Sequence, residues 1–184
     1  MNTVIKTLKV RVRDKHAKLL SKMAFEVNQV WNNANAYTAE YSSIPVPGVG
    51  YIRNHITAFD LSKEQKEYAK ERELNLIHSQ TVQAVTAEHH IRRKQFKKSK
   101  LRWRSSCGPR KSLGWVPFTG QSVKWVNGQF RYFGNYFKVW DTYGLSKYKF
   151  KAGSFSEDSR GEMVSKCSGG SPGRTFQRKN FSWG

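Results

Sequence analysis

The hydrophobic and polar positions alternate at the start of the chain and then change to a helical spacing. Over residues 3–13, Val4, Leu8, Val10 and Val12 fall on one side of an extended chain with basic residues between them, which predicts a strand with one solvent-facing side. Over residues 16–41 the apolar residues recur every three or four positions, which predicts an amphipathic helix. Residues 44–50 hold two prolines and two glycines, so this helix must end before them.

Two shorter helices are expected next. Ser62 and Gln65 have the spacing of a capping box, which predicts a helix from Ser62 to about Glu73. A further helix is predicted from about Ser79, and it carries on one side Val82, Val85, His89 and Phe96.

Beyond Cys107 the pattern changes to short aromatic and β-branched runs separated by turn residues. The pair Asn127-Gly128 between two such runs is the strongest short-range signal for a β-hairpin, and Gly134-Asn135 and Tyr143-Gly144 indicate further turns. We therefore expect a small antiparallel sheet or barrel over about 113–160. The predicted fold class is α+β.

Charge makes nucleic acid the natural partner. The 184 residues include 33 Lys and Arg against 13 Asp and Glu, a formal net charge of +20 that a polyanion would neutralise. No acidic residue lies between His89 and Trp140. The residues predicted to bind RNA or DNA fall in this segment: Arg92, Arg93, Lys94, Lys97, Lys98, Lys100, Arg102, Arg104, Arg110, Lys111, Trp115 and Lys124.

Aromatic side chains are interleaved with this basic segment and could stack on unpaired bases. In a sheet with alternating faces about half of them should be core, so only two or three are expected to touch nucleic acid. The set is Trp103, Trp115, Phe118, Trp125, Phe130, Tyr132, Phe133, Tyr136 and Phe137.

Other classes of function find little support. There is no apolar run near the ~18 residues of a spanning helix and no signal-peptide pattern, so a cytoplasmic protein without membrane or small-molecule partner is expected. Cys107 and Cys167 predict free thiols, and no ligand spacing indicates a metal or other cofactor. Glu88-His89-His90 point in different directions on a helix, which favours a structural role. No catalytic constellation is recognised, so no enzymatic activity is expected of this chain.

An ordered series of segments resembles the TnpB proteins, the OrfB-type proteins of insertion sequences, which are related to the type V CRISPR effectors. The resemblance covers residues 1 to about 162. It is carried by the opening Lys-Val-Arg-Val-Arg strand and by residues 30–35 (VWNNAN), 80–85 (QTVQAV), 112–118 (SLGWVPF), 127–128, 134–140 (GNYFKVW) and 153–161 (GSFSEDSRG).

The resemblance implies a wedge-like antiparallel β-barrel, formed by residues 1–14 and 113–162, that is interrupted by a helical recognition lobe over 15–112. In that family the two lobes hold a guide RNA and the guide–target duplex, while base pairing reads the sequence. Members are also described as transposases. DNA cutting belongs to a following RuvC-type nuclease domain with an inserted zinc ribbon, which this sequence lacks.

Residues 163–184 depart from the family pattern and have little apolar periodicity, which predicts a disordered tail. Dropping one nucleotide at the Met163 codon permits Trp-Tyr followed by a valine-rich strand, so we interpret the tail as the product of a frameshift. Two functions remain open. The chain is either the nucleic-acid-binding portion of a truncated TnpB-like protein or a stand-alone nucleic-acid-binding regulator without catalytic activity.

Overall fold

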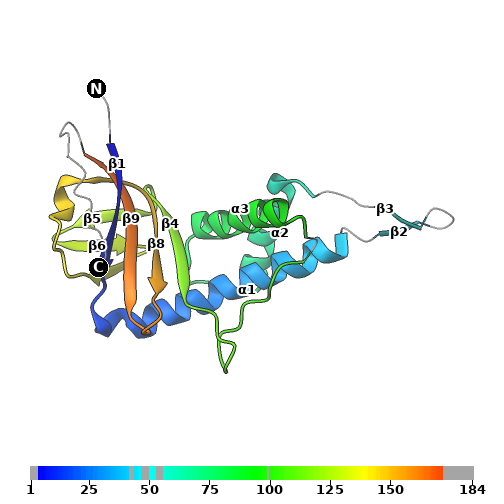
Figure 1. Cartoon of the computed structure of the whole chain (residues 1–184), viewed down its shortest axis with the longest axis horizontal. Helices are drawn as coiled ribbons and strands as arrows, with labels where there is room; N and C mark the ends of the chain where they lie inside the picture. Colours follow the sequence, from blue (N-terminus) through cyan, green and yellow to red (C-terminus); the bar gives the residue numbers. More distant parts are fainter. Residues whose placement is uncertain (1–3, 42–43, 47–49, 53–55, 99, 172–184) are drawn as a thin grey trace, which may run out of the picture.

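The computed structural model describes residues 4–41, 44–46, 50–52, 56–98 and 100–171. Three helices and two main antiparallel sheets make an α+β protein, as predicted (Figure 1). In chain order the elements are β1 (Val4–Arg11), η1 (Asp14–His16), α1 (Ala17–Tyr41), β2 (Ile44–Val46), β3 (Gly50–Ile52), α2 (Ala58–Glu71), α3 (Ser79–Phe96), β4 (Trp115–Thr119), β5 (Val123–Val126), β6 (Gln129–Tyr132), β7 (Asn135–Lys138), η2 (Leu145–Lys147), β8 (Lys149–Glu157) and β9 (Met163–Ser171).

Several predicted elements are confirmed within one or two residues. The opening strand is β1, the long amphipathic helix is α1, and the helix from Ser79 is α3. Asn127 and Gly128 join β5 to β6 and both have positive φ, 49° and 73°, as a tight hairpin turn requires.

The start of the second helix was predicted wrongly. Helix α2 begins at Ala58, because Thr57 rather than Ser62 caps it. The Thr57 hydroxyl oxygen accepts the backbone N–H of Asp60 at 3.1 Å and thereby satisfies one of the unpaired donors of the first turn.

The described strands form two main sheets and a separate β2-β3 hairpin, and among these residues there is no closed barrel, which corrects the barrel prediction. The larger sheet has the order β1-β9-β8-β4 and the smaller one the order β5-β6-β7. Continuous ladders do not join them. They meet where β1 and β7 end: Val12 forms an isolated bridge with Val139, and the Arg13 N–H donates to the Lys138 carbonyl at 2.9 Å.

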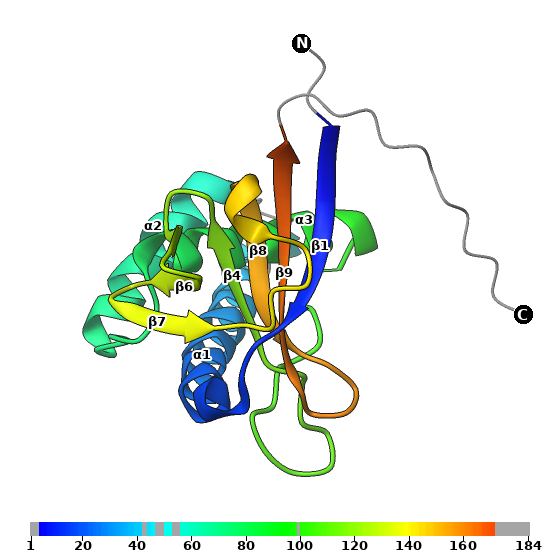
Figure 2. The same ribbon diagram turned by 90° about the vertical axis from the view of Figure 1, so that its left-hand side faces the viewer.

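The prediction of a disordered tail from residue 163 is wrong over Met163–Ser171, and the rest of the tail lies outside the described residues. This segment is β9, which pairs with β1 on one side and with β8 on the other (Figure 2). Met163 and Val164 are buried, and so are Ser165 and Cys167 further along the strand. Two of these side chains are small and weakly apolar, so a pattern based on hydrophobicity does not detect them.

The core lies between the two sheets and continues along α1. Five phenylalanine rings meet there, and they are Phe118, Phe130, Phe137, Phe150 and Phe155. About half of the aromatic set between Trp103 and Phe137 is buried, as expected for a sheet with alternating faces. The first half of α1 runs beneath the sheets and its second half packs against α2 and α3 (Figure 1).

Gly153 marks the closest approach inside the larger sheet. A Cβ atom at this position would meet the Phe118 ring at 2.6 Å and would also collide with the backbone oxygen of Lys166 on β9. Only glycine therefore allows β8 to lie this close to its neighbours.

Candidate nucleic-acid interface

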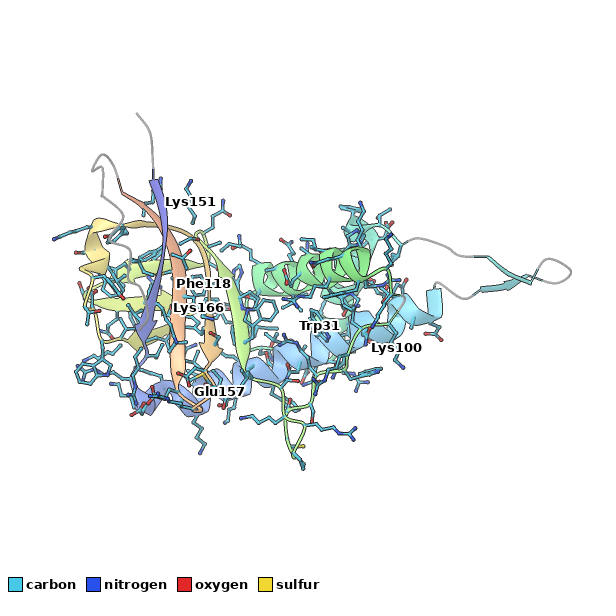
Figure 3. All side chains as sticks on the ribbon, viewed as in Figure 1. Trp31, Lys100, Phe118, Lys151, Glu157 and Lys166 are labelled. Carbon is cyan, nitrogen blue, oxygen red and sulfur yellow. The ribbon has the colours of Figure 1, made fainter. Side chains whose placement is uncertain are left out.

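The basic segment after α3 is an extended connector, residues 100–112, that lies along α1 (Figure 3). It has almost no regular secondary structure, so its backbone groups need partners from elsewhere. Side chains of α1 supply them.

Two asparagines of α1 each bind one connector residue through both ends of the amide. Asn35 donates to the Leu101 carbonyl and accepts the Leu101 N–H, both at 2.7 Å. Asn32 does the same with Arg104, both at 2.8 Å. In this way a side-chain amide replaces the neighbouring strand of a sheet.

Two further α1 side chains hold the connector, one between these two residues and one beyond them. The Trp31 indole N–H donates to the Arg102 carbonyl at 3.2 Å, and the Asn28 amide donates to the Ser106 hydroxyl at 3.0 Å. We call Asn28, Trp31, Asn32 and Asn35 the α1 polar ladder. Their three- and four-residue spacing places them on one face of the helix. Trp31, Asn32 and Asn35 hold the connector by its backbone, and Asn28 holds it by the Ser106 side chain.

Because the backbone is held, several connector side chains project outward. Lys100 and Arg102 are exposed, and Trp103 is 46% exposed. The Lys100 ammonium lies 5.3 Å from the centre of the Trp103 ring, a cation–π contact. This arrangement offers two cations and one aromatic face to a ligand.

Arg104 is placed differently from the other predicted binding residues. Its guanidinium carbon lies 4.9 Å from the centre of the Trp31 ring and 5.0 Å from that of Trp115. Burial lowers the pKa of this guanidinium from its usual value, and the neighbouring Arg92 acts in the same direction. Arg104 and the half-buried Trp115 therefore pack the connector against α1 and β4.

The basic residues at the end of α3 form a second group. Arg92 is exposed and pairs with Glu88 at 2.6 Å, whereas Arg93 is half-buried and donates to the Lys98 carbonyl at 3.4 Å. Lys97 adopts the left-handed conformation that ends the helix, with φ 51°. The exposed charges at this end of α3 are Arg92, Lys94, Lys97 and Lys98.

The remaining predicted residues lie apart from the end of α3. Arg110 is exposed at the tip of the connector, and Lys111 pairs with Glu157 at 3.0 Å. Lys124 is exposed on β5 in the smaller sheet. The exposed cations at the end of α3 and at the start of the connector therefore follow one another closely along the chain, within residues 92–102, whereas Lys124 lies in the smaller sheet.

One feature of the site was missed by the sequence reasoning. The polar ladder falls partly on residues 30–35, whose asparagines follow the helical spacing but carry no signal of what they bind. His89, in contrast, was predicted on the apolar side of α3, and it is fully buried there. Its ring makes an edge contact with Trp31 at 5.0 Å, and neither ring nitrogen has a partner among the described residues. Burial lowers the pKa of His89 to about 4.

Comparisons with known proteins add no relative to this picture. The fold and the site define an α+β protein that carries a basic connector clamped to a long helix. No family model matches the sequence, and no curated protein is significantly similar to it. Within the described ranges, no three His, Cys, Asp or Glu side chains are grouped to hold a metal ion, and no helix is long and apolar enough to cross a membrane.

Proposed function

We propose that this chain is a nucleic-acid-binding protein of the TnpB-like type, which holds structured RNA, DNA or both on its connector and the adjacent end of α3. The observation that carries the proposal is the polar ladder. It fixes the backbone of the connector and leaves Lys100, Arg102 and Trp103 exposed.

The chemistry of this surface matches a polyanion with accessible bases. Ammonium and guanidinium groups attract phosphates in a salt-dependent way, and an exposed indole gives unpaired bases a stacking surface. A rigid backbone lowers the entropy that is lost when such side chains bind. The net charge of +20 supports the same class of partner.

The segments that carry the TnpB resemblance fall on elements that build this frame. Residues 30–35 lie in α1 and include three ladder residues, and residues 112–118 lead from the connector into β4. Residues 134–140 contain β7 and residues 153–161 contain the end of β8. The interpretation of residues 163–184 as out of frame stays a prediction. The gene sequence tests it: a nuclease-encoding reading frame should follow directly downstream, and its absence would contradict the interpretation.

The test is binding to structured RNA, single-stranded DNA and duplex DNA at several salt concentrations. We expect salt-sensitive binding with a preference for structured RNA. The double variant Lys100→Gln/Arg102→Gln should reduce the slope of log affinity against log salt by about 1–2. Lys149→Gln/Lys151→Gln is the matched control, because it removes the same charge from exposed positions on β8. Absence of binding even at low salt would refute the proposal.

A further inference from the structure

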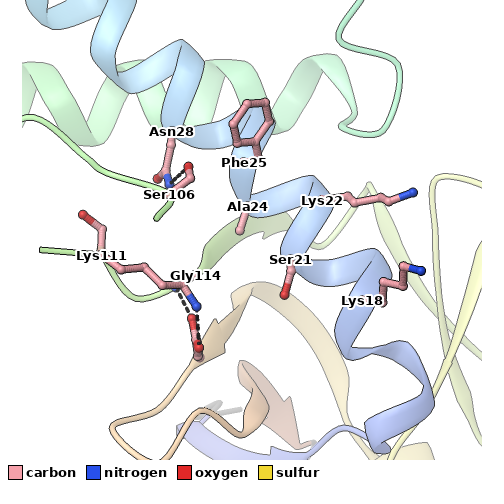
Figure 4. A pocket seen from close by; sticks show the side chains of 11 residues that line it. Lys18, Ser21, Lys22, Ala24, Phe25, Asn28, Ser106, Lys111 and Gly114 are labelled. Carbon is pink, nitrogen blue, oxygen red and sulfur yellow. Dashed lines mark hydrogen bonds and ion pairs between the residues drawn. The ribbon is translucent and has the colours of Figure 1, made fainter. Parts of the chain in front are cut away.

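A cavity of about 430 Å³ opens beside the first half of α1 (Figure 4). One wall is α1 itself, and the others come from the tip of the connector, the residue before β4 and the end of β8. Its volume falls within the range of sites for small organic ligands, roughly 300–1,000 Å³. None of the residues predicted to bind nucleic acid lines it except Lys111.

The cavity is positively charged. Lys18 and Lys22 line it from successive turns of α1, and Lys111 lines it from the connector. The single carboxylate there, Glu157, already accepts the Gly114 N–H and the Lys111 ammonium, both at 3.0 Å. Burial alone would raise the pKa of Glu157, but these hydrogen bonds outweigh it and lower the pKa, so the carboxylate stays ionised and engaged. Two lysines remain for an anionic ligand.

An aromatic ring completes the charged wall. Phe25 lines the same cavity and is 52% exposed. Lys18, Lys22 and Phe25 follow the i, i+4, i+7 spacing that places side chains on one helix face. A single exposed phenylalanine would need no explanation, but a ring that lines a cavity together with two lysines, neither of which forms an ion pair among the described residues, has the composition of a site for a base and its phosphate.

A buried amide joins two walls of the cavity. Asn28 on α1 is 4% exposed and lines the cavity, and its amide nitrogen donates to the hydroxyl of Ser106 on the connector at 3.0 Å. This hydrogen bond holds the connector wall of the cavity against α1.

We propose that this cavity binds one unpaired nucleotide of a single-stranded nucleic-acid segment. The base stacks on Phe25, while Lys18 and Lys22 bind the adjacent phosphates. This inference rests on the proposed function and adds to it a defined site for a single nucleotide outside the basic stretch 92–102.

The test uses the full chain and a short single-stranded RNA that carries the fluorescent base 2-aminopurine, with the same RNA annealed to its complement as a duplex. Phe25→Ala should weaken binding of the single strand about ten- to hundredfold, the usual range for loss of one base–aromatic stack. Phe25→Tyr keeps the ring and should bind like the unchanged protein. Lys22→Gln should lower the salt slope by about 1.

Phe59→Ala is the matched control, because Phe59 is 78% exposed on α2 and lies outside the cavity. Phe59→Ala should bind the single strand with unchanged affinity, and Phe25→Ala should bind the duplex with unchanged affinity. If the unchanged protein binds the RNA and Phe25→Ala binds it equally well, the nucleotide site is wrong while the proposed function stands. If the unchanged protein binds no RNA or DNA at any salt concentration, both are wrong.

Discussion

The reactivity of Cys167 measures whether β9 is formed in solution. The sequence has two cysteines, so replacing Cys107 by serine leaves Cys167 as the single thiol. This thiol is 1% exposed, and its burial raises its pKa from 9.0 to about 11. Thiols react as thiolates, and a rise of two pKa units lowers the thiolate fraction at pH 8 about a hundredfold.

We therefore expect a thiol reagent to modify native Cys107→Ser protein at least about a hundredfold more slowly than the same protein in denaturant. The opposite variant, Cys167→Ser, keeps only the exposed Cys107 and should be modified at nearly the same rate in both conditions. Circular dichroism would verify that both variants are folded. Equal rates for native and unfolded Cys167 in a folded protein would refute the central position of β9.

Three further predictions concern the ladder, the buried histidine and the closest approach in the sheet. Asn35→Ala leaves the Leu101 N–H and C=O without partners and should lower the free energy of unfolding by about 2–4 kcal/mol, with faster hydrogen exchange of the Leu101 amide. The pKa of His89 in the folded protein is about 4, below the ordinary histidine value of 6.5, because the ring is buried. The unfolded chain thus binds the proton more readily, and the free energy of unfolding should fall by about 3 kcal/mol between pH 6.5 and pH 4. Gly153→Ala forces a Cβ atom into the Phe118 ring and should lower the melting temperature, with a loss of at least about 2 kcal/mol.

Each of these has a control within the chain. Asn33→Ala removes a hydrogen bond to Gln65 on α2 and should leave Leu101 exchange unchanged. His89→Leu should flatten the dependence of stability on pH, and an unchanged slope would exclude His89 as its source. Ala152→Ser changes an exposed neighbour of Gly153 and should be tolerated, whereas equal melting temperatures for Gly153→Ala and the unchanged protein would contradict the close approach.

The sequence was sufficient where one local signal decides the structure. The apolar spacing of α1 and the Asn127-Gly128 turn are such cases, because periodicity and positive φ are properties of neighbouring residues. The start of the second helix was predicted wrongly because two residues, Thr57 and Ser62, could cap it. The prediction used Ser62, whereas Thr57 caps the helix in the structure. Neither choice follows from local spacing alone.

Long-range pairing could not be predicted in the same way. Ser165 and Cys167 contribute little to a hydrophobic pattern. Their burial depends on pairing with β1, which is distant in the sequence, and with β8, which precedes β9 and pairs with it in the antiparallel direction. The polar ladder likewise joins residues that are 66 to 78 positions apart. Of the candidate site, the sequence predicted the charges, whereas the partner that fixes their backbone became visible only in three dimensions.

The order of strands in the larger sheet also bears on how the protein is made. Strand β1 is synthesised before the other described elements, yet its ladder partner is β9, the last strand described. Until then β1 is an unpaired edge, and such edges recruit strands from other chains. Closing a loop of this length early is entropically unfavourable and slow. During synthesis α1, α2 and α3 can pack against one another before the larger sheet is complete. Rapid completion of the sheet, or a chaperone, then keeps β1 from pairing with a strand of another chain.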